Sequence, residues 1–297
     1  MKRLFAIILL LCLMTGIALA DNTDVKSYDF SADYADKFLA EGEKPIITKN
    51  SYKSQDISIE IKLIRKYDSD IYVADIYVRS MENFQRAYPY DKWGVSDKKI
   101  TELATKNNAV LAMTGDSSAY FEKGWVAGNG KIIRSTHNRI RDIFVVYKNG
   151  VMDAMRPDEI DQDKLKAEKK QIWHCFLFGP SLLNQNGKAY KEFHSNYDKI
   201  GSRNPRSAIG YYAPGHFCFV QVDGRKTQSK VDSAKTNKGI TLQDLAAYME
   251  SIGCKEAYNL DGGQSSMLWF SHKKEIYSTA YKNGRPLGDI VLIKEVQ

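Results

Sequence analysis

Apolar residues follow two patterns along the chain, strict alternation and short continuous runs. In Ile57–Ile64 every second residue is apolar, and Ile71–Val78 alternates in a similar way. Alternation predicts strands that bury one face. Continuous apolar runs predict strands buried on both faces. Such runs occur at Ala109–Met113, Ile143–Tyr147, Cys175–Phe178, Phe217–Val222 and Ile290–Ile293.

Helical periodicity is rarer than strand periodicity. The clearest helix is Leu242–Ile252, which Thr241 can cap and Gly253 can end. A second helix is predicted over Asp97–Asn107, and a weaker, mostly polar one over Asp158–Lys170. Because strands outnumber helices and do not alternate strictly with them, we predict an α+β fold. It would consist of mixed, mostly antiparallel β-sheets packed with a few helices in a single domain.

The first twenty residues have the pattern of an export signal. Lys2 and Arg3 precede an apolar run from Leu4 to Leu13, and Ala18-Leu19-Ala20 offers a signal-peptidase site. The run is shorter than the roughly 18 apolar residues that suggest a membrane span. We therefore predict a cleaved signal peptide at residues 1–20, with an uncleaved anchor as the alternative. The protein is expected to be secreted, periplasmic or at the cell surface.

The remaining chain is predicted to contain an extension and one core domain. Residues 21–56 are polar with scattered aromatics, and they suggest a leader helix from Tyr34 to Ala40 followed by an extended stretch. Residues 57–297 hold nearly all of the predicted strands and helices. We find no linker, repeat or internal boundary within them, so they are assigned to a single domain.

Charge and cysteine content exclude some classes of function. The net charge is +7, and removal of Lys2 and Arg3 with the signal lowers it to +5. This surplus is scattered and lacks the concentrated basic stripe of nucleic-acid-binding proteins. Cys175, Cys218 and Cys254 have no metal-binding spacing. They are expected to be buried thiols, although one disulfide is compatible with the sequence. Neither a metal nor a cofactor is predicted.

Four polar segments beside glycines adjoin the predicted strands and are candidates for chemistry. They are Thr114-Gly115-Asp116-Ser117-Ser118, Asn204 to Gly210, Asp223-Gly224-Arg225 and Asn259 to Ser266. Each also has a purely structural interpretation. Asp-Gly pairs are common hairpin turns, which applies to Asp223-Gly224 and Asp261-Gly262. Asp116 would suit a helix cap or a side-chain turn, and Arg206 would suit a surface ion pair.

The segment from Asn259 to Ser266 contains more functional groups than a turn requires. Adjacent Gly262 and Gly263 let backbone amides approach an anion closely. Gln264, Ser265 and Ser266 add hydrogen-bond donors, and Asp261 adds a carboxylate. The segment therefore suits a phosphate or a sugar. Local chemistry alone leaves the functional and the structural interpretation equally open.

Seven short motifs occur in a fixed order over roughly residues 57–294. They are Thr114-Gly115-Asp116, Asn129-Gly130 followed by Lys131 to Arg134, Phe178-Gly179-Pro180, Pro205 to Gly210, Val222 to Arg225, Leu242 to Ala246 and Asn259 to Ser266. This order resembles the phosphodiester glycosidase family, which includes the N-acetylglucosamine-1-phosphodiester α-N-acetylglucosaminidases. The chain departs from the family pattern at Thr114 (usually Asn), Ser207 (usually Thr) and Gln264 (usually Gly).

The resemblance implies hydrolysis of the sugar C1–O bond in a sugar-1-phosphodiester. It implies Asp261 near C1 as nucleophile or base, with Asp116 or Asp223 as a second carboxylate. Arg206 and Arg225 would hold the phosphate, because guanidinium groups match phosphate oxygens. The substrate-binding set implied by the motifs is Asn259, Gly262, Gly263, Ser265, Ser266 and Arg134.

The substrate would be a sugar-phosphate diester or phosphoglycan at the cell surface or outside the cell, for example an exopolysaccharide. Nucleic acid is not an expected partner. Two other functions stay open: an inactive carbohydrate-binding module, in which Thr114 and Gln264 mark lost activity, and a phosphodiesterase that breaks P–O. Among the histidines, His174 is predicted to lie in the core, and His216 is the nearest candidate for acid–base chemistry.

Overall fold

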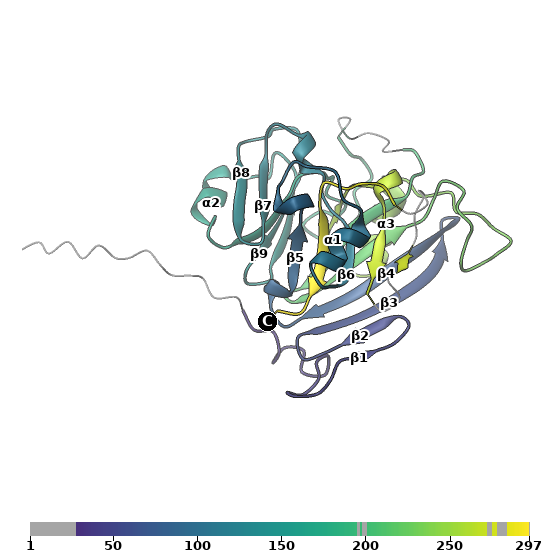
Figure 1. Ribbon diagram of the computed structural model, residues 1–297. Helices are drawn as coiled ribbons and strands as arrows, with labels where there is room; N and C mark the ends of the chain where they lie inside the picture. Colours follow the sequence, from purple (N-terminus) through teal and green to yellow (C-terminus); the bar gives the residue numbers. More distant parts are fainter. Residues whose placement is uncertain (1–27, 195–196, 198–200, 272–274, 278–283, 297) are drawn as a thin grey trace, which may run out of the picture.

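β-Strands dominate the fold, as the alternation predicts. The computed structural model describes residues 28–194, 197, 201–271, 275–277 and 284–296, and in these residues the strands form three sheets (Figure 1). Every strand pair within the sheets is antiparallel. The predicted α+β class, mostly antiparallel with few helices, is confirmed.

The three sheets are named here by their size or central strand. The large sheet has the order β1 (Ile46–Ile47), β2 (Ser51–Lys53), β3 (Ile57–Lys66), β4 (Ser69–Val78), β13 (His216–Val222), β12 (Arg206–Ala213), β14 (Glu256–Asn259). The β9 sheet has the order β10 (Met152–Met155), β9 (Ile143–Tyr147), β11 (Ile172–Phe176), β7 (Trp125–Gly128), β8 (Lys131–Ser135). The β6 sheet has the order β16 (Glu275–Tyr277), β15 (Leu268–Phe270), β6 (Ala109–Thr114), β17 (Ile290–Lys294), β5 (Phe84–Ala87).

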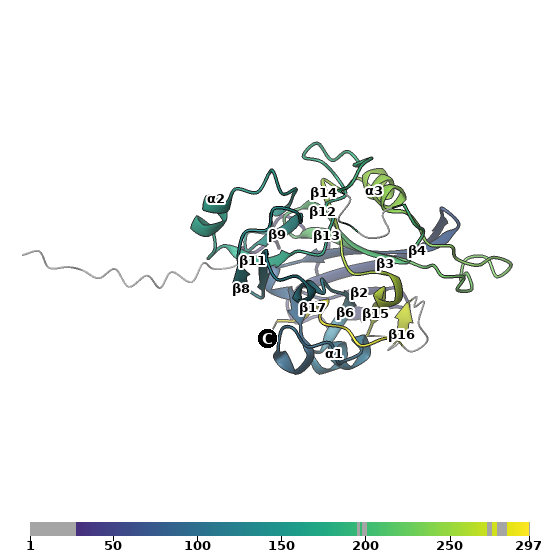
Figure 2. The ribbon, with the colours of Figure 1, turned by 90° about the horizontal axis from the view of Figure 1, so that it is seen from above.

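The large sheet is covered on both faces. Helix α3 (Leu242–Ser251) lies over one face, the β6 sheet packs on the other, and α1 (Ile100–Lys106) covers the outer face of the β6 sheet (Figure 2). Strand β13 shows why its sequence is a continuous apolar run. Phe217 and Phe219 belong to the core shared with the β6 sheet, whereas Cys218 and Val220 pack under α3.

The three α-helices lie where the sequence predicts them, but they are shorter than predicted. The α3 cap is as predicted: the Asp244 amide donates to Thr241 Oγ1 at 3.0 Å. Helix α1 begins at Ile100 rather than Asp97, because Lys98 is extended and its carbonyl accepts the Leu287 amide at 2.9 Å. Helix α2 covers only Gln162–Ala167. Residues 31–37 form turns where a leader helix from Tyr34 was predicted.

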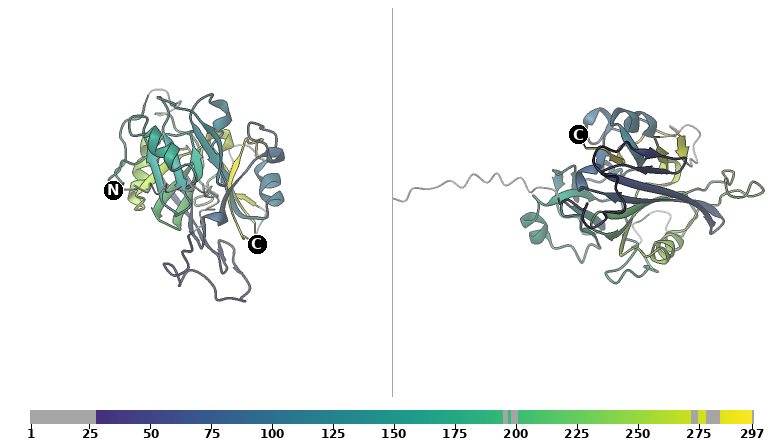
Figure 3. Two further views of the ribbon diagram at one scale, coloured as in Figure 1. Left: turned by 90° about the vertical axis from the view of Figure 1, so that its left-hand side faces the viewer. Right: turned by 90° about the horizontal axis from the view of Figure 1, so that it is seen from below.

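The described residues of the predicted N-terminal extension, from residue 28 onward, contact the rest of the fold. Strands β1 and β2 extend the edge of the large sheet, and they lie at one end of the molecule (Figure 3). Phe30 is buried in the main core. The predicted signal peptide, residues 1–20, lies outside the described residues. Within the described part of the chain, no helix is long and apolar enough to cross a membrane.

Candidate functional site

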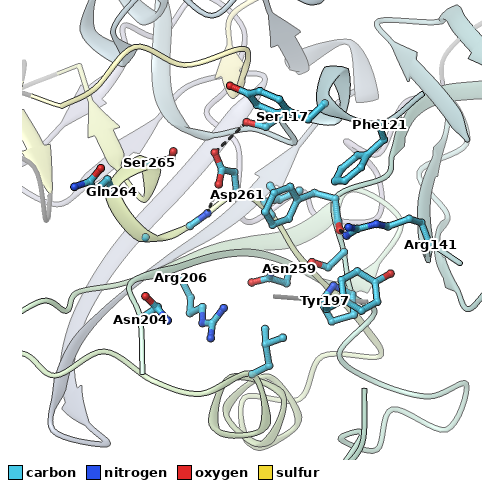
Figure 4. Close-up of a pocket in the computed structure, with 18 of the residues that line it drawn as sticks. Ser117, Phe121, Arg141, Tyr197, Asn204, Arg206, Asn259, Asp261, Gln264 and Ser265 are labelled. Atoms are coloured by element: carbon cyan, nitrogen blue, oxygen red, sulfur yellow. Dashed lines mark hydrogen bonds between the residues drawn. The ribbon is translucent and has the colours of Figure 1, made fainter. Parts of the chain in front are cut away.

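A cavity of about 470 Å³ opens where the ends of the three sheets meet. The segment after β6 supplies Ser117, the segment before β9 supplies Arg141, and β12 begins at Arg206. The connection from β14 to β15 supplies residues 259–265 (Figure 4). The cavity therefore depends on how the sheets pack together rather than on one loop.

The segment from Asn259 to Ser266 is not a hairpin. Strand β14, before it, belongs to the large sheet, and β15, after it, belongs to the β6 sheet. A short 3₁₀ turn, η4 (Gly263–Ser265), makes the crossing. Gly263 has φ +63°, a conformation that glycine adopts without strain, and its amide donates to the Pro205 carbonyl at 2.9 Å. The segment thus passes directly between two sheets at the cavity wall.

Asp261 is the one carboxylate among the described residues that line the cavity. Its Oδ2 accepts the Ser117 hydroxyl at 3.0 Å, and its Oδ1 accepts the Gly262 amide at 2.8 Å (Figure 4). Burial raises the pKa of Asp261 above its ordinary value, while hydrogen bonds from Ser265, Ser117 and Gly262 oppose that rise. A raised pKa makes the ionised carboxylate a stronger base at neutral pH.

Ser117 reaches Asp261 because its own backbone is held in an unusual conformation. It has φ +48°, which is uncommon for a residue other than glycine. The Asp289 Oδ1 accepts the amides of Asp116 and Ser117, each at 2.9 Å. Buried Arg86 in turn donates to Asp289 Oδ2 at 2.6 Å. A Cβ on Gly115 would lie only 2.5 Å from the Asp289 carboxyl carbon, so glycine is required there.

Four arginines line the same cavity: Arg141, Arg206, Arg225 and Arg285. Arg206 is buried at the start of β12, where its guanidinium donates to the carbonyls of Ile240 at 3.2 Å and Ser202 at 3.0 Å. Burial lowers the pKa of Arg206 to about 10, so it remains protonated at neutral pH. Four cations around one carboxylate make the cavity suitable for an anionic ligand.

Asn259 presents a fixed hydrogen-bond acceptor. Its amide nitrogen donates to the Gly179 carbonyl at 2.8 Å, and its backbone amide donates to the Pro180 carbonyl at 3.0 Å. These bonds fix the side chain, and its buried Oδ1 has no hydrogen-bond partner among the described residues. A buried acceptor without a partner is costly, and a ligand hydroxyl or amide in the cavity would satisfy it.

The structure brings seven of the predicted site residues to the cavity wall and leaves four away from it. Those on the wall are Asp261, Arg206, Arg225, Asn259, Gly262, Gly263 and Ser265. The other four, Asp116, Asp223, Ser266 and Arg134, are not among the lining residues. Their roles in catalysis or binding stay predictions, and their contacts are as follows.

The two aspartates predicted as partners of Asp261 are both buried. The Asp116 carboxylate accepts the amides of Leu177 and Phe178, the latter at 2.8 Å, and lies 3.7 Å from Arg86. Asp223 follows β13, and its Oδ1 has no hydrogen-bond partner among the described residues. Burial, helped by nearby Asp70, raises the pKa of Asp223 to about 7.

Ser266 and Arg134 make contacts within the protein. The Ser266 hydroxyl donates to the Arg206 carbonyl at 2.8 Å, which ties the segment to β12. Arg134 donates to the carbonyls of Gly124, at 3.0 Å, and Phe121, and so braces the chain that leads out of the Ser117 turn.

Two of the three departures from the family pattern, Thr114 and Gln264, leave the cavity unobstructed. Thr114 is buried away from the cavity wall, where its hydroxyl donates to the Ser265 carbonyl and accepts the Met267 amide at 3.1 Å. Gln264 is exposed, and Figure 4 shows its side chain at the edge of the site, away from Asp261. Gln264 has no positive φ, so its side chain imposes no backbone strain.

Several lining residues were given no catalytic or binding role from the sequence. They are Ser117, Tyr120, Phe121, Arg141, Phe178, Tyr197 and Arg285. Ser117 lies in the first candidate segment, and Phe178 begins one of the seven motifs. Arg141, Tyr197 and Arg285 stand alone in polar stretches, so no local pattern separates them from surface residues.

None of the described histidines and cysteines lines the cavity. His174 is buried as predicted: its Nδ1 accepts the Asn129 amide at 3.2 Å, which leaves Nε2 to donate to the Phe84 carbonyl. His216 lies against Asp75, with 2.8 Å between Nε2 and Oδ1. The three cysteines described are buried and free. The described residues contain no group of three or more His, Cys, Asp or Glu side chains that could hold a metal ion.

Comparisons with known proteins agree with this arrangement. The family model for phosphodiester glycosidases matches residues 99–294. The SPbeta prophage-derived uncharacterized protein YomE of Bacillus subtilis is 30% identical over 122 residues, which cover 41% of this chain and 17% of that protein. The chain therefore matches only a small part of that relative's length.

Two solved structures share the fold at low sequence identity. The auto-inhibited catalytic domain of zebrafish N-acetylglucosamine-1-phosphodiester alpha-N-acetylglucosaminidase is 16% identical, with a TM-score of 0.60, over 81% of this chain and 83% of that one. A hypothetical protein from Synechocystis is 12% identical, with a TM-score of 0.53, over 85% of this chain and 64% of that one.

Proposed function

Because the chain belongs to the phosphodiester glycosidase family, we propose that it hydrolyses the C1–O bond of a sugar-1-phosphodiester, such as an N-acetylglucosamine-1-phosphodiester. The observation that carries this proposal is the placement of Asp261 in a cavity lined by four arginines. A carboxylate stabilises the positive charge that develops at the sugar carbon. The arginines stabilise the negative charge that develops on the departing phosphate.

In the proposed step, the oxygen of a water molecule bonds to C1 as the C1–O bond to phosphate breaks. The phosphate monoester leaves with the electron pair of that bond, and Asp261 takes a proton from the attacking water. Ordinary glycosidases use a second carboxyl group to protonate the leaving group. A phosphate monoester is a weak base that needs little protonation. One carboxylate on the wall therefore suffices, and we propose inversion of configuration at C1.

The arginines near Asp261 would have two roles in this step. They would bind the phosphate of the substrate and stabilise the negative charge that develops on it. Arg225 lies beside Gly263, with its Nη2 3.0 Å from the position a Cβ would occupy there. Arg285 lies close enough to Asp261 to lower its pKa against the effect of burial. A phosphate near Gly262 and Gly263 would therefore meet both guanidinium groups. The two glycine amides already donate within the protein, to Asp261 Oδ1 and to the Pro205 carbonyl. Asn259 Oδ1 would accept a hydroxyl or acetamido N–H of the sugar.

The test is release of free sugar from a synthetic sugar-1-phosphate methyl diester. We expect the Asp261→Asn variant to lose at least about 100-fold in kcat, the lower range for a general base. Exposed Asp158→Asn serves as the matched control. NMR of the first product should show the inverted anomer. In ¹⁸O-water the label should enter the sugar.

Each of the other outcomes would contradict part of the proposal and indicate a different site or function. Undiminished turnover by Asp261→Asn would contradict the site assignment. Label in the phosphate would show a phosphodiesterase that breaks P–O. Saturable binding of the diester without any product would show a carbohydrate-binding module.

We further propose that residues 1–20 direct export and are cleaved after Ala20, so that the enzyme acts on a glycan outside the cytoplasm. The motif at Ala18-Leu19-Ala20 supports this proposal. Expression of the full chain in a bacterial host should give a mature protein that begins at Asp21 by mass spectrometry of the exported fraction. An intact Met1 terminus in that fraction would show an uncleaved anchor, and retention in the cytoplasm would contradict export.

A further inference from the structure

A second, smaller pocket of about 140 Å³ adjoins the cavity at the Ser117 turn. It is lined by residues 93–96, 117–120 and 288–289 and is called the Trp93 pocket below. Ser117 and Tyr120 line both the pocket and the cavity, so the two spaces share a wall. Since about 10–15 Å³ of such space holds one water molecule, the pocket has room for roughly ten non-hydrogen atoms. Its size is therefore close to that of one sugar ring.

The Trp93 pocket differs from the cavity in charge. None of the described residues that line it is an arginine, lysine or histidine, and Asp289 is its one described charged residue. The Asp289 carboxylate already has partners within the protein, because Oδ1 accepts two backbone amides and Oδ2 accepts buried Arg86. A carboxylate without a cation beside it in the pocket repels an anionic group. The pocket therefore suits a neutral group, whereas the cavity suits an anionic one.

The wall of the Trp93 pocket has the chemistry of a sugar site. The Ser118 hydroxyl in this wall is buried and has no hydrogen-bond partner among the described residues. A buried hydroxyl without a partner is costly, and it can both donate and accept. Trp93 and Tyr120 add aromatic rings, and Tyr120 is 69% exposed. Aromatic side chains with a few placed polar groups are typical of binding sites for small molecules.

The hydrogen bonds of Asp261 indicate which end of the substrate reaches the Trp93 pocket. Its Oδ1 accepts the Gly262 amide at 2.8 Å, whereas its Oδ2 accepts the Ser117 hydroxyl at 3.0 Å (Figure 4). The phosphate of the proposed substrate lies near Gly262 and Gly263, and Ser117 contacts the other oxygen of the carboxylate. A substrate that continues past Ser117 therefore does so from its sugar rather than from its phosphate.

Resting on the proposed function, we propose that the Trp93 pocket binds a second, neutral sugar linked to the sugar that undergoes hydrolysis. The substrate is then the 1-phosphodiester of a disaccharide or of a longer glycan. The cavity holds the phosphate and the first sugar, and the Ser118 hydroxyl bonds to a hydroxyl of the second. The oxygen of water bonds to C1 of the first sugar as the phosphate monoester leaves with the electron pair. The disaccharide is released whole.

The length of the substrate tests this second site. The probes are methyl diesters of N-acetylglucosamine 1-phosphate and of three disaccharide 1-phosphates, which carry a hexose on O3, O4 or O6 of the N-acetylglucosamine. We expect kcat/KM for at least one disaccharide to exceed that for the single sugar by about tenfold. Equal or lower values for all three would overturn the inference. So would a gain that appears only when the hexose is esterified to the phosphate instead.

A binding measurement separates this inference from the proposed function. Isothermal titration of the same probes into the Asp261→Asn variant should give a Kd about tenfold lower for the preferred disaccharide than for the single sugar. This difference does not depend on turnover. Failure of the wild-type protein to hydrolyse any of the probes would overturn the proposed function. Equal Kd values for the single sugar and all three disaccharides would overturn the second sugar site.

Gly288 allows the Trp93 pocket to be filled without strain. A Cβ at this position would have no listed neighbour closer than 3.9 Å, and Gly288 is not among the glycines with positive φ. We expect Gly288→Leu to remove the preference for the disaccharide in kcat/KM, because the leucine side chain would occupy the space of the second sugar. Gly288→Ala should reduce the preference less, since its single methyl group leaves most of the pocket open.

Gly201→Leu is the matched control. Gly201 also has open space at its Cβ position and no positive φ, but it lines neither the cavity nor the Trp93 pocket. Its ratio of the two kcat/KM values should stay at the wild-type value. Tyr120→Ala changes an exposed side chain and should lower the ratio severalfold, which keeps the test open if Gly288→Leu does not fold. A wild-type ratio in a folded Gly288→Leu variant, or in Tyr120→Ala, would overturn the inference.

Discussion

Asp261 shows how opposing effects set the basicity of one side chain. Burial raises its pKa, whereas hydrogen bonds from Ser265, Ser117 and Gly262 lower it. Burial is the larger effect, so the carboxylate is a stronger base than an exposed aspartate, and the hydrogen bonds limit the rise of its pKa.

Loss of the Ser117 hydroxyl should move the pH dependence of the reaction upward. The hydroxyl donates to Asp261 Oδ2 at 3.0 Å and stabilises the ionised form. Without it the pKa rises, so the acid limb of the kcat/KM profile for Ser117→Ala should shift by about one pH unit to higher pH. The activity of the variant should fall most at low pH, where Asp261 becomes protonated.

Ser118→Ala is the matched control, because the buried Ser118 hydroxyl has no hydrogen-bond partner among the described residues. Its acid limb should coincide with that of the wild type. A Ser117→Ala profile with an unchanged limb, or with a limb at lower pH, would show that Asp261 is not the group that titrates.

At the scale of elements, the sequence predicted best what depends on local pattern. Strand β9 was predicted with its observed bounds, Ile143–Tyr147, because a continuous apolar run buried on both faces has few other solutions. Helix α3 was identified from its cap and periodicity. Strands β14 and β15 are only four and three residues long and gave no periodic signal. Their assignment to different sheets is a tertiary property.

The motifs predicted the location of the site better than the role of each residue. The segment from Asn259 to Ser266 lines the cavity from Asn259 to Ser265. Asp116 lies in a motif that suggests a catalytic carboxylate. Its observed hydrogen bonds, however, hold the backbone amides of Leu177 and Phe178. Sequence cannot separate these roles, because both need a buried aspartate after an apolar strand. Arg141 could not be found, since only the packing of the β9 sheet brings it to the cavity.

At the scale of the whole molecule, the layers that build the site also bury charge. The large sheet lies between α3 and the β6 sheet, so polar groups at its strand ends lose contact with water. Asp70 at the start of β4 is fully buried, and its carboxylate accepts Arg65, at 3.1 Å, and the Ser229 hydroxyl. Asp223, beside it, is almost as deeply buried and has an oxygen without a partner among the described residues.

The ionisation of Asp223 should therefore make the stability of the fold depend on pH. Its pKa is about 7 in the folded chain, against an ordinary value of 3.8, because of burial and the nearby Asp70, with Lys230 acting in the opposite direction. Between these two pH values the folded chain holds a proton that the unfolded chain has released. Raising the pH through this window therefore favours unfolding, and stability is lost progressively up to about pH 7.

Asp223→Asn keeps the size of the side chain and removes its ionisation. The Tm of the variant minus that of the wild type should therefore increase as the pH is raised from about 4 to about 8, by roughly 2–4 °C for each kcal/mol that ionisation of Asp223 costs the wild type. Differential scanning calorimetry at several pH values measures this difference. Exposed Asp158→Asn should show a constant difference over the same range. A constant difference for Asp223→Asn as well would show that Asp223 is ionised in the folded protein at all of these pH values, with a partner that compensates its burial.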